Sequence, residues 1–166
     1  MACLRPSFVL SCLLALGPGI SAAAQAAGEP SLERLASCAD SWMDWKQDAA
    51  MAEQFRNYFL ARFEQEPRSP GWQPRRPATV FGLPVVKAYP QSVGMGLGFS
   101  LEVRAAPADV RRAMERAIDR PLQCERAEGA LSCEAKLADR RTALVIAADE
   151  GRGQPSLIGC FYYYQQ

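Results

Sequence analysis

The longest run of alternating side chains covers residues 92–104, which read SVGMGLGFSLEVR. Every odd position from Val93 to Val103 is apolar, and every even position is glycine, serine or a charged residue. Because successive side chains of a strand point to opposite faces, this pattern predicts one long strand. Its apolar face belongs to a core, and its glycine and serine face allows another backbone, a helix or a ligand to approach closely.

The first 26 residues are organised like a secretory signal peptide. Arg5 precedes an apolar run over residues 8–16, and a segment of small residues follows with an A-x-A cleavage site at 24–26. The apolar run is too short to span a bilayer. We therefore expect a periplasmic or secreted chain with no transmembrane segment after signal cleavage.

The charge balance argues against two classes of partner. The chain has 19 Lys and Arg residues and 18 Asp and Glu residues, with a formal net charge of +1. This balance favours neither a nucleic acid nor an anionic membrane surface as the partner. The mature chain of about 140 residues has the length of a single domain.

Four cysteines follow the predicted cleavage site, and an even number behind a signal peptide predicts disulfides. Cys124 and Cys133 are equidistant from residues 128–129, so a two-residue hairpin turn places them opposite each other, about 4.5 Å apart at Cα in a non-hydrogen-bonded pair. By elimination, Cys38 pairs with Cys160. A longer loop would shift the register by one, because residue 128 is Glu, which suits a type I′ turn poorly.

The mature chain divides into three parts by pattern. Residues 27–66 have helical spacing of apolar residues, 67–78 read as a proline-rich loop, and 79–166 as the order β-β-α-β-β-β-β. A single helix over 31–66 would be about 54 Å long, too long for a small domain, so we expect two helices or a bend near 46–48.

Residues 107–119 form the clearest helical pattern, with Pro107 at its start and Pro121 after its end. Short connections between the other elements favour antiparallel pairing. The predicted fold is α+β, with a single antiparallel sheet of about five or six strands and two disulfides. The N-terminal helices and the further helix are expected on one face of the sheet.

The absence of histidine excludes several catalytic classes. Ser-His-Asp and Cys-His catalysis and histidine-ligated zinc sites all require that residue. Paired cysteines act neither as nucleophiles nor as metal ligands, and no spacing singles out a pair of carboxylates. We therefore expect no catalytic residue, no cofactor and no metal site.

Exposed aromatic and arginine residues are the candidate partner-binding groups, because both types are enriched at binding hot spots. These are Trp72, Arg75 and Arg76 of the proline-rich loop, and Tyr162 and Tyr164 of the terminal FYYYQQ segment. The alternative is structural: Trp72 folds back over the core edge, and the tyrosines are half-buried strand residues.

A second candidate site is a small-molecule cleft near Tyr89, over Gly94, Gly96 and Gly98. These glycines resemble part of a dinucleotide-binding fingerprint, which requires a helix directly after it. Here the pattern continues as a strand, so a structural role for the glycines competes with the cleft.

The sequence thus predicts a secreted or periplasmic non-enzymatic binding protein of the inhibitor, immunity or adaptor type, acting on another envelope or secreted protein. The first alternative is a binding module for a small molecule or an envelope component. The second alternative is a carboxylate-based hydrolase of envelope polysaccharide, which needs two acidic groups converging in one pocket.

Overall fold

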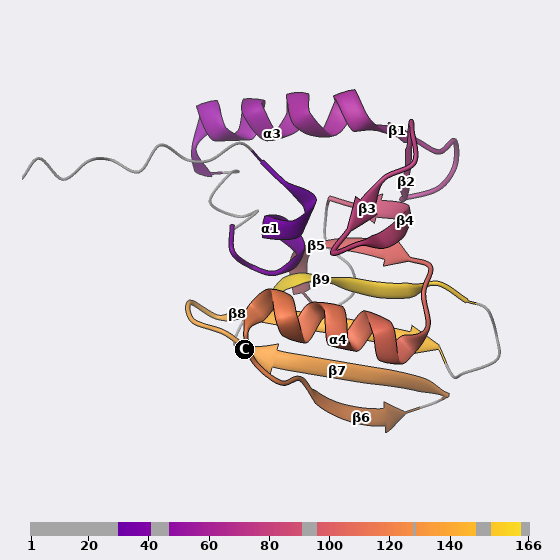
Figure 1. Cartoon of the computed structure of the whole chain (residues 1–166). Helices are drawn as coiled ribbons and strands as arrows, with labels where there is room; N and C mark the ends of the chain where they lie inside the picture. The colour runs from indigo at the N-terminus through magenta and orange to yellow at the C-terminus, as the bar shows by residue number, and fades with distance from the viewer. Residues whose placement is uncertain (1–29, 41–46, 91–95, 128, 149–153, 164–166) are drawn as a thin grey trace, which may run out of the picture.

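The computed structural model describes residues 30–40, 47–90, 96–127, 129–148 and 154–163 (Figure 1). Its helices are α1 (Leu32–Ala36), α3 (Ala49–Arg62) and α4 (Pro107–Ile118). Its strands are β1 (Phe63–Gln65), β2 (Trp72–Pro74), β3 (Thr79–Val80), β4 (Leu83–Tyr89), β5 (Gly96–Val103), β6 (Gln123–Ala127), β7 (Ala130–Lys136), β8 (Arg141–Ala148) and β9 (Ser156–Tyr163). The predicted signal peptide lies outside the described residues.

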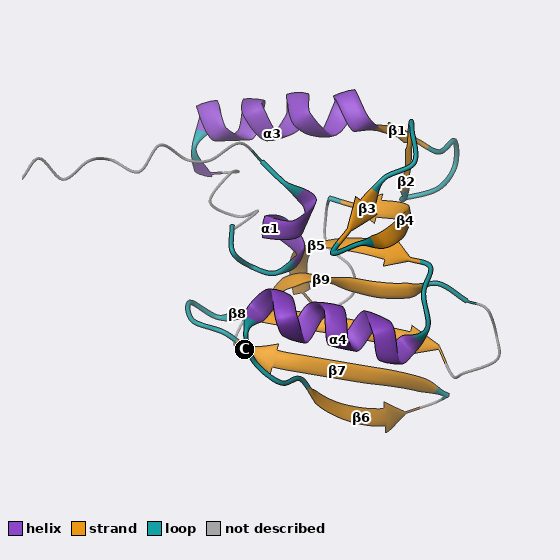
Figure 2. Cartoon of the chain, viewed as in Figure 1, coloured by secondary structure: helices purple, strands orange, loops and turns teal. Residues whose placement is uncertain are grey.

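The strands form one sheet in the order β1-β2-β4-β5-β9-β8-β7-β6, with β3 attached to β4 (Figure 2). Every neighbouring pair is antiparallel. The predicted α+β class with an antiparallel sheet is confirmed, but the expected five or six strands are too few, since the described residues alone form a sheet of nine. The strands β1, β2 and β3 are two or three residues long, too short to show a periodic pattern in the sequence.

The alternating stretch forms strand β5, which lies at the centre of the sheet. Phe99, Leu101 and Val103 are fully buried, as the apolar face predicted. Residues 92–95 of the alternating stretch lie outside the described residues. Strand β5 pairs with β4 on one side and with β9 on the other.

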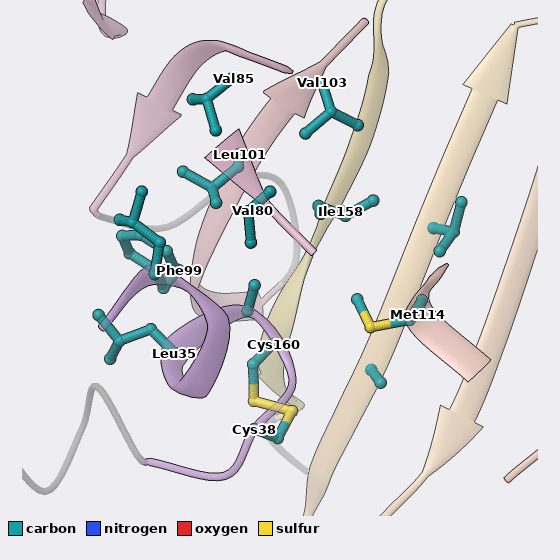
Figure 3. Close-up of a cluster of buried hydrophobic side chains, with 14 of the residues drawn as sticks. Leu35, Cys38, Val80, Val85, Phe99, Leu101, Val103, Met114, Ile158 and Cys160 are labelled. Carbon is teal, nitrogen blue, oxygen red and sulfur yellow. A yellow bond between two sulfur atoms is a disulfide. The ribbon is translucent and has the colours of Figure 1, made fainter. Parts of the chain in front are cut away.

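We call one surface of the sheet the helix face. It carries Phe99, Cys160 and Ala143, which are register partners on β5, β9 and β8 and therefore point to the same side. Helix α1 contacts β5 and β9, and its C-terminal end is joined to Cys160 by a disulfide from Cys38. Helix α4 contacts β8 and β9, and Figure 3 shows Met114 of this helix and Leu35 of α1 in the same core.

The described residues of the N-terminal part form two separate helices, α1 and α3, as expected from a helical pattern too long for one helix. The Ser31 side chain accepts a hydrogen bond from the backbone N–H of Arg34 at the start of α1. The Asp48 side chain accepts one from the backbone N–H of Met51 at the start of α3. Each cap satisfies a backbone donor that the helix cannot pair internally.

Two predicted boundaries are wrong in this region. Residues 63–65 are strand β1 instead of helix, although Phe63 continues the helical spacing of aromatic residues. Its ring stacks on Phe59 at 4.7 Å between centroids, so the same aromatic cluster is kept while the backbone becomes extended. The proline-rich loop contains strand β2, because Trp72 pairs with Ala88 in β4 and packs against Phe59.

Both predicted disulfides are present in the structure. Cys38 and Cys160 lie 5.1 Å apart at Cα, and Cys124 and Cys133 lie 4.0 Å apart as direct register partners of β6 and β7. Ala127 pairs with Ala130, which leaves a two-residue turn at 128–129, as the spacing predicted. Residue 128 itself lies outside the described residues.

Candidate functional site

A groove of about 640 Å³ lies where the end of α3, the start of α1 and the segment between β2 and β3 meet. We call it the arginine groove, because Arg62, Arg75 and Arg76 line it. Its remaining lining is apolar and comes from Leu32, Ala61, Phe63, Pro77 and Ala78. The lining therefore combines three positive charges with an apolar surface, and none of the described residues that form it is acidic.

Arg75 joins the segment after β2 to the end of α3 through hydrogen bonds and an ion pair. Its Nε donates hydrogen bonds to the carbonyl oxygens of Leu60 and Phe63, at 3.2 and 3.1 Å. These carbonyls lie at the C-terminal end of α3, where helix carbonyls lack internal partners and attract positive charge. Its Nη1 forms an ion pair with Glu64 at 3.0 Å. Arg75 was predicted to bind a partner, and the structure gives it these internal contacts.

Arg62 and Arg76 differ from Arg75 in how they are engaged. The Arg62 guanidinium lies over the Tyr58 ring, 4.0 Å from its centroid, and its Nη1 donates to the Tyr58 carbonyl oxygen at 3.3 Å. Arg76 is exposed and forms no hydrogen bond or ion pair with any other residue that the structure describes. Arg76 is therefore the guanidinium of the groove that is available to an incoming anion.

The structure separates the other predicted partner-binding residues from this groove or from one another. Trp72 is half-buried, with its ring edge against Phe59 at 5.2 Å, as its structural alternative expected. Tyr162 is half-buried in β9, which β4 and β5 separate from β2. Tyr164 lies outside the described residues. The arginine groove unites only Arg75 and Arg76 of the predicted set.

Sequence reasoning missed Arg62 and Leu32 as groove residues. Arg62 is the last residue of α3, and an arginine in the last turn of a predicted helix is the signal that could have singled it out. Leu32 has no such signal, because its position in the groove depends on how α1 packs beside α3.

The candidate cleft near Tyr89 lies on the opposite face of the sheet from the helices. The Tyr89 hydroxyl donates to Glu102 Oε1 at 2.6 Å, and its burial together with this hydrogen bond raises its pKa to about 12. A Cβ atom on Gly98 would lie 2.4 Å from the Cys160 carbonyl oxygen. The group that approaches Gly98 closely is therefore the backbone of β9. Gly96 pairs with Tyr163, and Gly94 lies outside the described residues.

The two carboxylates nearest this region have partners in the structure. Glu66 Oε2 accepts a hydrogen bond from Lys87 Nζ at 2.7 Å, which lowers the pKa of Glu66. Glu102 accepts the Tyr89 hydroxyl. Within the described part of the chain, no three His, Cys, Asp or Glu side chains converge to bind a metal ion. None of the described helices is long and apolar enough to cross a membrane.

The chain matches no protein-family model, no curated protein and no solved structure. The candidate site therefore rests on its own geometry and charge.

Proposed function

We propose that this chain is a non-enzymatic protein of the periplasm or the secreted space that binds another envelope or secreted protein through the arginine groove. The observation that carries the proposal is a concave, partly apolar surface whose described lining residues include three arginines and no acid. Such a surface suits an acidic segment of a partner, because carboxylates pair with guanidinium groups and an apolar side chain can occupy the floor.

The state of each arginine supports a division of roles. Arg75 is held by two carbonyls and by Glu64, so it shapes the groove and adds positive charge. Arg76 has no hydrogen-bond or ion-pair partner among the described residues and is the expected contact for a partner carboxylate. The two disulfides support an oxidising compartment for the protein, where such bonds form and persist.

The test is affinity capture from a periplasmic or secreted extract with the oxidised protein, comparing wild type with Arg76→Glu. The matched control is Arg116→Glu, which makes the same charge change at an exposed position of α4, far along the chain from the groove. We expect wild type and Arg116→Glu to retain the same protein, and Arg76→Glu to lose it.

Capture should also weaken as the salt concentration rises, because exposed charge pairs are screened. A partner that Arg76→Glu retains as well as wild type does would show that binding occurs elsewhere. If no variant retains any protein, the binding function itself is wrong.

A further inference from the structure

We infer that the Cys124–Cys133 disulfide is a thiol–disulfide exchange site, at which an external thiolate attacks Sγ of Cys124 and leaves Cys133 as the departing thiol. The inference is independent of the arginine groove. It follows from where this disulfide lies in the sheet and from what surrounds each of its two sulfur atoms.

The disulfide joins the outermost strand of the sheet to its neighbour. The strand order ends at β6, which pairs with β7, and Cys124 lies directly opposite Cys133 in that pair. Residue Cys124 is exposed, whereas Cys133 is fully buried. The bond therefore runs from the inside of the sheet towards its edge.

Access to the two sulfur atoms differs because exchange proceeds by attack along the axis of the S–S bond. An attack on Cys133 would come from the side of β8, where its register partner is Val145. Val145 is fully buried and points to the same helix face, so the core and not solvent borders Cys133 on that side. Attack on Cys124 comes from beyond β6, where the described chain places no further strand.

The residues that flank Cys124 in β6, Gln123 and Glu125, are exposed and polar. The attacking thiol therefore meets a polar edge of the sheet, so the reactive partner is a hydrophilic thiol and not an apolar one.

The external thiolate bonds to Sγ of Cys124, the S–S bond breaks, and Cys133 leaves with the electron pair and takes up a proton. The product is a mixed disulfide at Cys124. When the reductant is a dithiol, its second thiolate attacks its own sulfur in the mixed disulfide and releases Cys124. The cystine is then reduced by two electrons and the dithiol is oxidised to a disulfide.

The second disulfide is the internal control for this proposal. Cys38 and Cys160 are both buried, and they join α1 to a central strand. In contrast, residues 123–126 of β6 are all exposed, so opening the Cys124–Cys133 bond removes no side chain of these residues from the core. Exchange at the edge should therefore release the covalent tie on β6 and leave the fold intact.

The first experiment treats the oxidised full chain with glutathione under native conditions, quenches with acid, and maps the adducts by peptide mass spectrometry. We expect the glutathionyl group on Cys124, a free thiol at Cys133, an intact Cys38–Cys160 bond and an unchanged circular dichroism spectrum. An adduct on Cys133, or opening of Cys38–Cys160 at the same rate, would overturn the proposal.

The second experiment compares Cys133→Ser with Cys124→Ser, which lose the same disulfide and keep one thiol each. The remaining thiol should react with an aromatic disulfide reagent faster in Cys133→Ser, on the order of tenfold or more, because its thiol is at the edge. Both thiols should react equally in denaturant. Equal rates in the native state would contradict attack at Cys124 alone, and the wild-type mapping decides the matter should either variant fail to fold.

Discussion

Arg141 of β8 donates a hydrogen bond from Nη1 to the carbonyl oxygen of Cys38 at 2.7 Å, although the two residues are 103 positions apart. Cys38 has a positive φ of 61° and is joined through its sulfur to Cys160 of β9. One covalent bond and one charge-assisted hydrogen bond therefore fix the end of α1 to two adjacent strands. This junction determines where α1 lies on the sheet.

Replacing Arg141 by Met should lower the free energy of unfolding by about 2 kcal/mol, because it removes a hydrogen bond from a charged donor to a carbonyl of a buried residue. Urea unfolding at neutral pH measures the change. The control is Arg140→Met, since Arg140 is exposed and has no hydrogen bond or ion pair among the described residues. The control should change stability by about 0.5 kcal/mol or less, and equal losses in both variants would contradict the role given to Arg141.

Removing the Cys38–Cys160 disulfide by a double substitution to Ala should cost more stability than removing Cys124–Cys133 in the same way. The sequence separations are 122 and 9 residues, and loop-closure entropy then gives about 4.9 and about 2.7 kcal/mol. Denaturant unfolding of the two double variants gives the comparison. A larger loss from the edge disulfide would show that β6 carries more of the fold than its exposure indicates.

Gly159→Ala should be among the most damaging small substitutions in the chain. A Cβ atom at this position would lie 2.2 Å from the Phe99 carbonyl oxygen and 2.8 Å from Ser100 Cα, and both are backbone atoms that cannot move aside singly. We expect a loss of about 3 kcal/mol in thermal or urea unfolding.

The comparison for Gly159 is Gly82→Ala. Gly82 has a φ of 79° and no atom within 4 Å of an added Cβ, so only backbone strain of about 1–2 kcal/mol is expected there. If Gly159→Ala costs no more than Gly82→Ala, then β5 and β9 are farther apart than the structure shows.

Glu115 should make stability depend on acid pH. Its carboxylate accepts a hydrogen bond from the backbone N–H of Leu122 at 3.0 Å and forms an ion pair with Arg111 at 2.8 Å, and in that order these contacts lower its pKa below 4.5. The carboxylate therefore stabilises the fold above pH 4.5, and this contribution is lost as the pH falls through the lowered pKa.

Urea unfolding of wild type and Glu115→Gln at pH 7 and pH 3 measures this contribution. The two proteins should differ in stability at pH 7 and become more alike at pH 3, because both then have a neutral side chain at position 115. Arg111→Met should retain part of the effect, since the Leu122 hydrogen bond remains. A difference that does not shrink with acid would contradict the assignment.

Local pattern was sufficient where one segment decides its own structure. The alternating side chains predicted β5, the spacing around residues 128–129 predicted the β6–β7 hairpin and its disulfide, and the prolines bounded α4. Each of these depends on neighbours within about ten residues, through side-chain period, turn geometry or backbone dihedral. The very short strands β1 and β2 exist only because other strands pair with them, and their segment of the sequence carries no period of its own.

The candidate site shows the same division more sharply. Arg75 and Arg76 could be selected from the sequence as candidates. The sequence did not show that Arg75 donates hydrogen bonds to carbonyl oxygens at the end of α3, whereas Arg76 is exposed. Leu32 and Arg62 join them only because α1 and α3 meet beside the segment between β2 and β3. The exchange site likewise depends on β6 being the last strand in the order.

The sequence by itself determined the α+β class, the absence of histidine chemistry, the central strand and the two cysteine pairings, because composition and short-range geometry decide these. The tertiary structure alone decided that β9 lies between β5 and β8, which arginine of the groove has no partner among the described residues, and which disulfide lies at an edge. Those properties come from pairing between segments far apart in the chain, and many pairings bury similar apolar area, so local patterns cannot choose among them.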